Sequence, residues 1–94
     1  MKNVQLFING NFRDSSDKNT IKTTDPSNNE VIAEVQIPSG KDIDDAVTAA
    51  HHAFYESDWR DYDAAKRSEI LLKTSELIKE RRKELIEWEI KDSG

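Results

Sequence analysis

The longest hydrophobic pattern in the chain lies between residues 64 and 91, where apolar side chains recur on one face of a helix. The positions at this spacing, called the apolar stripe below, are Ile70, Leu71, Leu77, Ile78, Leu85 and Trp88. Such a pattern is typical of a helix that buries one face. Asp63 can cap its first turn, and Gly94 can end it with a positive φ. The pattern therefore predicts one long helix over residues 63–92.

Short apolar segments separated by turn residues fill the first 38 positions. The predicted strands cover residues 4–8, 11–13, 21–24 and 31–37. Asn9 and Gly10 follow the first strand and favour a type I′ hairpin turn, because both residues tolerate positive φ. The last strand alternates apolar and polar residues, as a half-buried strand does. Residues 1–38 are therefore predicted to form short antiparallel β-hairpins.

A second helical pattern starts after Pro38. Ser39 and Asp42 have the spacing of a capping box, with Asp in place of the usual Glu. Apolar residues follow at helical spacing, and one side is rich in alanine, which suits close packing against another element. The chain is thus predicted to have an α+β fold, in which hairpins are followed by two α-helices at 39–56 and 63–92. The first helix is expected to cover part of the apolar stripe.

Composition narrows the class of protein. The chain carries a net charge of −5 and no cysteine, so disulfides, thiolate metal sites and a cysteine nucleophile are excluded within it. Residues 1–63 hold six Lys and Arg against twelve Asp and Glu, which argues against a nucleic-acid partner. No segment approaches the roughly 18 apolar residues of a membrane span, and residues 1–10 lack the apolar region of a signal peptide. We expect a cytoplasmic protein without a nucleic-acid or membrane partner.

Few residues are candidates for chemistry. His51 and His52 are adjacent, so on a helix they point about 100° apart and do not chelate one metal together. The acids at 42, 44 and 45 occupy a first helical turn, where the helix dipole favours negative charge. Trp59 and Trp88 have the spacing of core aromatics rather than of a ligand pocket. With glycine only at positions 10, 40 and 94, no phosphate-binding loop is present. We assign no catalytic and no cofactor-binding residue.

The order of several short motifs resembles a known family. These motifs are Leu6-Phe7-Ile8-Asn9-Gly10, Asp25-Pro26, Glu30-Val31-Ile32, Asp45-Ala46-Val47, Ala49-Ala50, Ala53-Phe54, Trp59, Arg67, Glu84-Leu85, Glu89, Asp92 and Gly94. In this order and spacing they resemble the N-terminal segment of the NAD(P)-dependent aldehyde dehydrogenase superfamily, including betaine aldehyde dehydrogenases. Asp25 replaces the usual Asn and Asn29 the usual Gly, and both replacements suit turns.

The resemblance implies that the chain is a fragment. In this family the dinucleotide-binding core, the nucleophilic cysteine, the glutamate base and the oxyanion-hole asparagine all follow later in the sequence. The parent chain is then expected to oxidise an aldehyde to a carboxylic acid with NAD or NADP. The 94 residues alone are expected to be inactive and to bind no cofactor. Their expected partners are the remainder of the dehydrogenase chain and, in a homo-oligomer, further copies.

The resemblance also implies one site within the chain. Some family members bind a monovalent cation such as K⁺ through backbone carbonyls before the Asn-Pro turn and an aspartate after the long helix. The matching positions are Thr23, Thr24 and Asp92, whose oxygens suit a hard cation. The alternative is that Asp92 accepts local backbone hydrogen bonds at a helix end. For the fragment alone this alternative is favoured, because further ligands should come from the remainder of the chain.

A second class of function remains open: a stand-alone helical interaction or oligomerisation module without enzymatic activity. The seven-residue recurrence within the apolar stripe would support a helical dimer. The other seam position reads Thr74, Arg81 and Trp88, which suits a coiled coil poorly. The hairpins have no role in such a module. In either class, a partly covered apolar stripe predicts self-association or a loosely folded chain.

Overall fold

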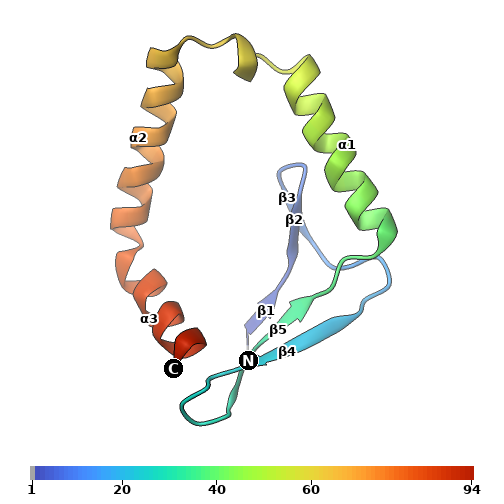
Figure 1. Cartoon of the computed structure of the whole chain (residues 1–94), viewed down its shortest axis with the longest axis vertical. Coiled ribbons are helices and arrows are strands. Elements are labelled where there is room, and N and C mark those ends of the chain that lie inside the picture. The colour runs from blue at the N-terminus through green and yellow to red at the C-terminus, as the bar shows by residue number, and fades with distance from the viewer. Residues whose placement is uncertain (1) are drawn as a thin grey trace.

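A computed structural model of the protein describes residues 2–94 and shows short strands followed by helices (Figure 1). The strands are β1 (Lys2–Val4), β2 (Leu6–Ile8), β3 (Asn11–Arg13), β4 (Thr20–Thr24) and β5 (Val31–Gln36). β2 and β3 form an antiparallel hairpin, in which Asn9 and Gly10 have φ values of 53° and 79°. Since a type I′ turn requires positive φ at both positions, the predicted hairpin is confirmed.

The second sheet has the strand order β1-β5-β4. β4 and β5 pair in antiparallel fashion, as predicted, whereas β1 pairs with β5 in parallel. The single strand expected over residues 4–8 is therefore two strands, separated at Gln5, whose amide donates a hydrogen bond to Asp14 (3.0 Å). The hydrophobic pattern could not show that the two strands belong to different sheets. Side chains alternate in the same way in parallel and antiparallel strands, so the pattern does not indicate which partner a strand pairs with.

Both predicted helix starts are confirmed by their caps. Before α1 (Gly40–Glu56), the Ser39 hydroxyl accepts from the Asp42 N–H, and the Asp42 carboxylate accepts from the Ser39 N–H. After a short 3₁₀ helix, η1 (Trp59–Asp61), the Asp63 carboxylate accepts from Lys66 N–H at the start of α2 (Ala64–Glu80). α3 (Arg82–Ser93) ends at Gly94, which has the expected positive φ of 76°.

The predicted long helix over 63–92 is divided at Arg81. Arg81 has φ −98° and ψ 11°, outside the α-helical region, and α3 begins after it. No Gly or Pro marks this point, but helix propensity is a weak constraint that tertiary contacts override. Beyond the division, α3 contacts β4, and its Trp88 meets Lys2 of β1. The α+β class with strands before helices is confirmed, and two predicted helices become three.

The elements enclose an open ring rather than a closed core (Figure 1). The chain measures 48 × 34 × 15 Å, with a radius of gyration of 17.0 Å, whereas a compact domain of this length has about 12 Å. Its accessible surface is 7602 Å², against about 5,500 Å² for a compact protein of this mass. Residues 2–94 therefore leave much of their apolar surface uncovered.

The alanine-rich side of α1 faces the β2–β3 hairpin instead of the long helix. Ala46, Ala49, Ala50 and Ala53 line a hollow together with the tip of the hairpin. The expectation that α1 covers the apolar stripe is therefore wrong: α1 and α2 lie on opposite sides of the ring (Figure 1). Within residues 2–94, no helix is long and apolar enough to span a bilayer.

Candidate functional site

Two of the three predicted cation ligands line the same pocket, between the three-stranded sheet and α3. Thr23 of β4 and Asp92 of α3 both contribute to this pocket, which we call the β4–α3 pocket and which has a volume of about 370 Å³. Thr24 follows a register shift in β4 and does not line it. The structure thus brings Thr23 and Asp92 together and leaves Thr24 outside.

The lining of the β4–α3 pocket combines apolar and charged side chains. Val4, Ile32, Ala33, Val35 and Leu85 form the apolar part, with Trp88 beside them. Lys2, Glu89 and Asp92 supply the charges. Carboxylate, hydroxyl and carbonyl oxygens are the donors that hard cations prefer. The donor set therefore fits a monovalent cation, although residues 2–94 contain no cluster of three or more His, Cys, Asp or Glu.

The Asp92 carboxylate is not used to cap its own helix. At this helix end, Gly94 N–H donates to the Ile90 carbonyl (3.0 Å) and Ser93 Oγ donates to the Glu89 carbonyl (2.7 Å). No hydrogen bond to Asp92 from the described residues accompanies them. The alternative role for Asp92 was to accept hydrogen bonds at its own helix end. In the structure, the Gly94 N–H and the Ser93 hydroxyl donate to backbone carbonyls instead.

The end of α3 is fixed against the β4–β5 turn. A Cβ at Gly94 would lie 3.1 Å from Pro26 Cβ and 3.2 Å from Ser27 N, so a side chain there would force the turn to move. Within the turn, the Ser27 hydroxyl and N–H both donate to Asp25 (2.6 and 2.8 Å). These bonds lower the pKa of Asp25, and the nearby charge of Lys91 lowers it further. The pocket wall formed by α3 is therefore held in place from its C-terminal end.

Trp88 is half-buried, and two ammonium groups lie near its ring. Lys2 Nζ is 4.8 Å and Lys91 Nζ is 5.1 Å from the ring centroid. The face of an indole ring attracts cations through its quadrupole. Only Lys2 of the two lysines lines the β4–α3 pocket. Trp88 is therefore both a packing residue and part of a pocket, whereas sequence reasoning had favoured packing alone.

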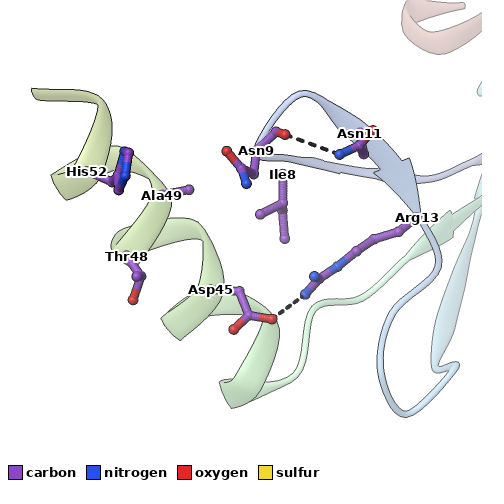
Figure 2. A pocket seen from close by; sticks show the side chains of 8 residues that line it. All are labelled: Ile8, Asn9, Asn11, Arg13, Asp45, Thr48, Ala49 and His52. Carbon is purple, nitrogen blue, oxygen red and sulfur yellow. Dashed lines mark hydrogen bonds and ion pairs between the residues drawn. The ribbon is translucent and has the colours of Figure 1, made fainter. Parts of the chain in front are cut away.

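A second pocket lies between the β2–β3 hairpin and α1 (Figure 2). It has a volume of about 440 Å³. Figure 2 shows Arg13 reaching from the hairpin across to Asp45 on α1, where the two groups are 2.9 Å apart. His52 lines the same pocket, while its Nε2 contacts Glu56 Oε2 at 2.7 Å. The neighbouring His51 packs on Tyr55, with 4.5 Å between ring centroids. The Arg13–Asp45 ion pair in this pocket thus joins the β2–β3 hairpin to α1.

Asp42 accepts hydrogen bonds from several parts of the chain, and its side chain is fully buried. Its carboxylate accepts from the backbone N–H of Ser39 (2.9 Å) and of Ser16 (3.0 Å), from the Ser16 hydroxyl and from Arg13 (2.7 Å). The hydroxyl and N–H of Ser16 lower the pKa of Asp42 far below its usual range, and Ser39 and Arg13 add to this effect. The carboxylate therefore joins α1 to the loop after β3.

Sequence reasoning found only part of this cluster. The Ser39–Asp42 capping box was predicted from local spacing, but the partners Arg13 and Ser16 lie 29 and 26 residues earlier in the chain. Buried Gln36 was missed as well; its Oε1 accepts from Ser15 N–H (2.9 Å). No periodic pattern marks such distant polar pairs. Lys2 and Glu89, which line the β4–α3 pocket, were missed for the same reason.

Comparison with known proteins identifies related sequences. The model of the "Aldehyde dehydrogenase family" matches residues 12–94. The chain is 42% identical over 94 residues to aldehyde dehydrogenase family 2 member B4, mitochondrial, of Arabidopsis thaliana, covering 100% of this chain and 18% of that protein. It is 38% identical over 90 residues to aminoacetaldehyde dehydrogenase of Pseudomonas aeruginosa, covering 96% and 18%.

Solved structures give the same result. The chain superposes on the NAD⁺ complex of an aldehyde dehydrogenase from Bacillus cereus with a TM-score of 0.92 and 35% identity, over 99% of this chain and 19% of that chain. It thus spans less than a fifth of the length of the relatives it matches. Since the family match extends over most of the sequence and the fold agrees, the chain belongs to the aldehyde dehydrogenase family.

Proposed function

We propose that these 94 residues are the N-terminal segment of an enzyme that oxidises an aldehyde to a carboxylic acid, with NAD or NADP as the hydride acceptor. The observation that carries the proposal is the superposition of 99% of this chain on the NAD⁺ complex of the Bacillus cereus aldehyde dehydrogenase. That likeness covers 19% of the relative. In the proposed enzyme, the remaining four-fifths supplies the cofactor site and the reacting groups.

The exposed apolar surface of the chain supports this division of roles. No residue of α2 or α3 is buried, and Leu71, Ile78 and Leu85 are 65%, 54% and 49% exposed. A large uncovered apolar face usually marks an interface. We propose that the remainder of the dehydrogenase chain covers it. In the alternative interaction module, the stripe would need one continuous helix, and the division at Arg81 interrupts it.

A chimeric enzyme tests the proposal. Residues 1–94 replace the matching segment of the Bacillus cereus enzyme, and the formation of NADH is followed with an aldehyde substrate. The proposal predicts NADH formation by the chimera and none by the 94 residues alone, which lack a cysteine nucleophile. The unaltered Bacillus cereus enzyme is the positive control. A chimera that folds and binds NAD but forms no NADH would contradict the proposal.

We also propose that the β4–α3 pocket holds a monovalent cation such as K⁺ in the whole enzyme. Support comes from Thr23 and Asp92, which line the pocket together, and from the Asp92 carboxylate, which has no hydrogen-bond donor among residues 2–94. β4 is an edge strand of its sheet, so its outer carbonyls face no other strand in the described part of the chain. Thr23 would contribute its carbonyl oxygen and Asp92 a full negative charge, whereas Thr24, which lies outside the pocket, is not among the proposed ligands.

Thermal unfolding in potassium chloride tests the cation site. At potassium tenfold above its Kd, binding to the folded state alone adds about 1.4 kcal/mol of stability by mass action. Choline chloride keeps the ionic strength constant. In the chimera, Asp92→Ala should remove most of the potassium-dependent rise in Tm. Glu87→Ala is the matched control, because it removes a carboxylate of α3 outside the pocket. Equal potassium effects in all three proteins would rule the site out.

A further inference from the structure

The β4–α3 pocket contains a positive charge supplied by the chain itself. Lys2, at the start of β1, lines the pocket together with Thr23 and Asp92. Its ammonium group lies 4.8 Å from the centroid of the Trp88 ring. Among residues 2–94, none of the ion pairs within 4.0 Å involves Lys2. The ammonium thus lies over an aromatic face, in a pocket whose two carboxylates, Glu89 and Asp92, form no ion pair with any residue between 2 and 94.

The surroundings of this ammonium are those that any small monovalent cation would find favourable. The indole face attracts positive charge, and Glu89 and Asp92 add two carboxylates to the pocket lining. An ammonium group carries the same charge as K⁺ and is similar in size. Two such charges in one small pocket repel each other. Lys2, Glu89 and Asp92 are exposed, so salt screens this repulsion and the ionic strength must be held constant when affinities are compared.

We propose that the Lys2 ammonium is a built-in competitor for the monovalent cation of the β4–α3 pocket. This inference rests on the proposed cation site. Lys2 occupies the pocket when the cation is absent and leaves the Trp88 ring when the cation binds. The strand β1 then carries a residue that sets the affinity for the cation without being one of its ligands.

Lys91 provides a matched control for Lys2. Its ammonium lies 5.1 Å from the same ring centroid, but Lys91 does not line the pocket. We therefore compare Lys2→Met with Lys91→Met, since methionine keeps an unbranched apolar stem and removes the charge. Lys2→Met should raise the affinity for K⁺ roughly three- to tenfold, whereas Lys91→Met should change it by less than about twofold. Affinities come from Tm as a function of potassium chloride at constant ionic strength, in the chain and in the chimera.

Nuclear magnetic resonance gives a second readout that needs no enzymatic activity. The ring current of Trp88 shifts the ε-methylene protons of Lys2 and Lys91 from their free positions. Potassium chloride should return the Lys2 signals towards the free positions and leave the Lys91 signals in place. Circular dichroism confirms that both variants keep the fold.

The outcomes separate this inference from the proposal on which it rests. Tighter potassium binding by Lys2→Met, with displacement of Lys2 from Trp88 in the wild type, supports the competitor. A potassium response confined to Lys2→Met also supports it. Equal affinities for wild type and Lys2→Met would overturn the competitor and leave the cation site standing. If no protein responds to potassium, including the chimera, the cation site fails and the competitor fails with it.

Discussion

Two regions of the chain are held together in different ways: the first, residues 2–56, contains the strands and α1, and the second, residues 64–93, contains α2 and α3. Within residues 2–94, every buried residue lies between Ser15 and Asp42, and three of these four side chains are polar and hydrogen-bonded. In α2 and α3, by contrast, no residue is buried, although apolar side chains recur along both helices. The first region satisfies its polar groups within the chain, and no buried side-chain atom of the described residues lacks a partner. The second region presents apolar surface that requires another surface to cover it.

This difference separates two sources of stability. A polar cluster resists change because each group removed leaves a partner unsatisfied. An exposed apolar face contributes little until it is covered, when each large side chain adds roughly 1.5–3 kcal/mol. Substitutions in the first region should therefore lower the stability of the isolated chain. Substitutions in the second region should mainly weaken its association with another surface.

The largest effect is expected at Asp42. Asp42→Ala removes the acceptor shared by Ser16, Ser39 and Arg13. The donors of Ser16 and the Ser39 N–H lose this partner, while Arg13 keeps its contact with Asp45. We expect Tm to fall by more than about 10 °C. Asp44→Ala, an exposed acid in the same helical turn, is the control and should change Tm by less than about 2 °C. Similar melting curves for the two variants, measured by circular dichroism, would show that the cluster does not hold the first region together.

A smaller effect is expected from acid, and it should depend on the same residue. Hydrogen bonds lower the pKa of Asp42, chiefly those from Ser16, and the pKa of Asp45, chiefly that from Lys41. A carboxyl with a lowered folded-state pKa contributes stability above its unfolded pKa of 3.8 and loses it as the pH falls towards the folded value.

In the wild type, the contribution of these carboxylates to the unfolding free energy should therefore be constant between about pH 7 and about pH 5, and it should be lost below about pH 4. In Asp42→Ala the decline below about pH 4 should be shallower. Urea unfolding across this range measures both proteins. Parallel pH profiles would mean that other groups govern acid unfolding.

The smallest change in intrinsic stability is expected in the second region. We propose that the isolated chain self-associates through the apolar stripe. Ile78→Lys should then shift sedimentation towards the monomer and lower helicity, while the monomer's own unfolding free energy changes by less than about 0.5 kcal/mol. Leu72→Lys is the control, because Leu72 is also exposed (64%, against 54% for Ile78) but lies on the opposite side of α2. A compact wild-type monomer with a sharp melt would exclude this association.

Sequence reasoning succeeded where a local signal determined the structure. The positive φ values at Asn9 and Gly10 followed from their tolerance of the left-handed region. The caps at Ser39 and Asp63 followed from side chains that bond the nearest free N–H groups. The family resemblance, confirmed by the match over residues 12–94, rested on the order of such local motifs.

Features that depend on distant residues were not predictable in this way. The division at Arg81 has no local signal and accompanies packing of α3 against the strands. The cluster around Asp42 joins residues 13–16 to the start of α1, two stretches that only the folded chain brings together. For the candidate site, the resemblance supplied Thr23, Thr24 and Asp92, but it gave no sign of Lys2.

The parallel pairing of β1 with β5 also sets an order of events in folding. Lys2 pairs with Ala33, so this contact closes a loop of about thirty residues, whereas the β2–β3 hairpin closes within its own turn. Local hairpins form in roughly 1–10 μs, and contacts between distant residues form more slowly because a long loop loses more entropy on closure. β1 is therefore expected to pair after the local hairpins have formed. Since Lys2 reaches the pocket only on that strand, the β4–α3 pocket acquires its internal charge late in folding.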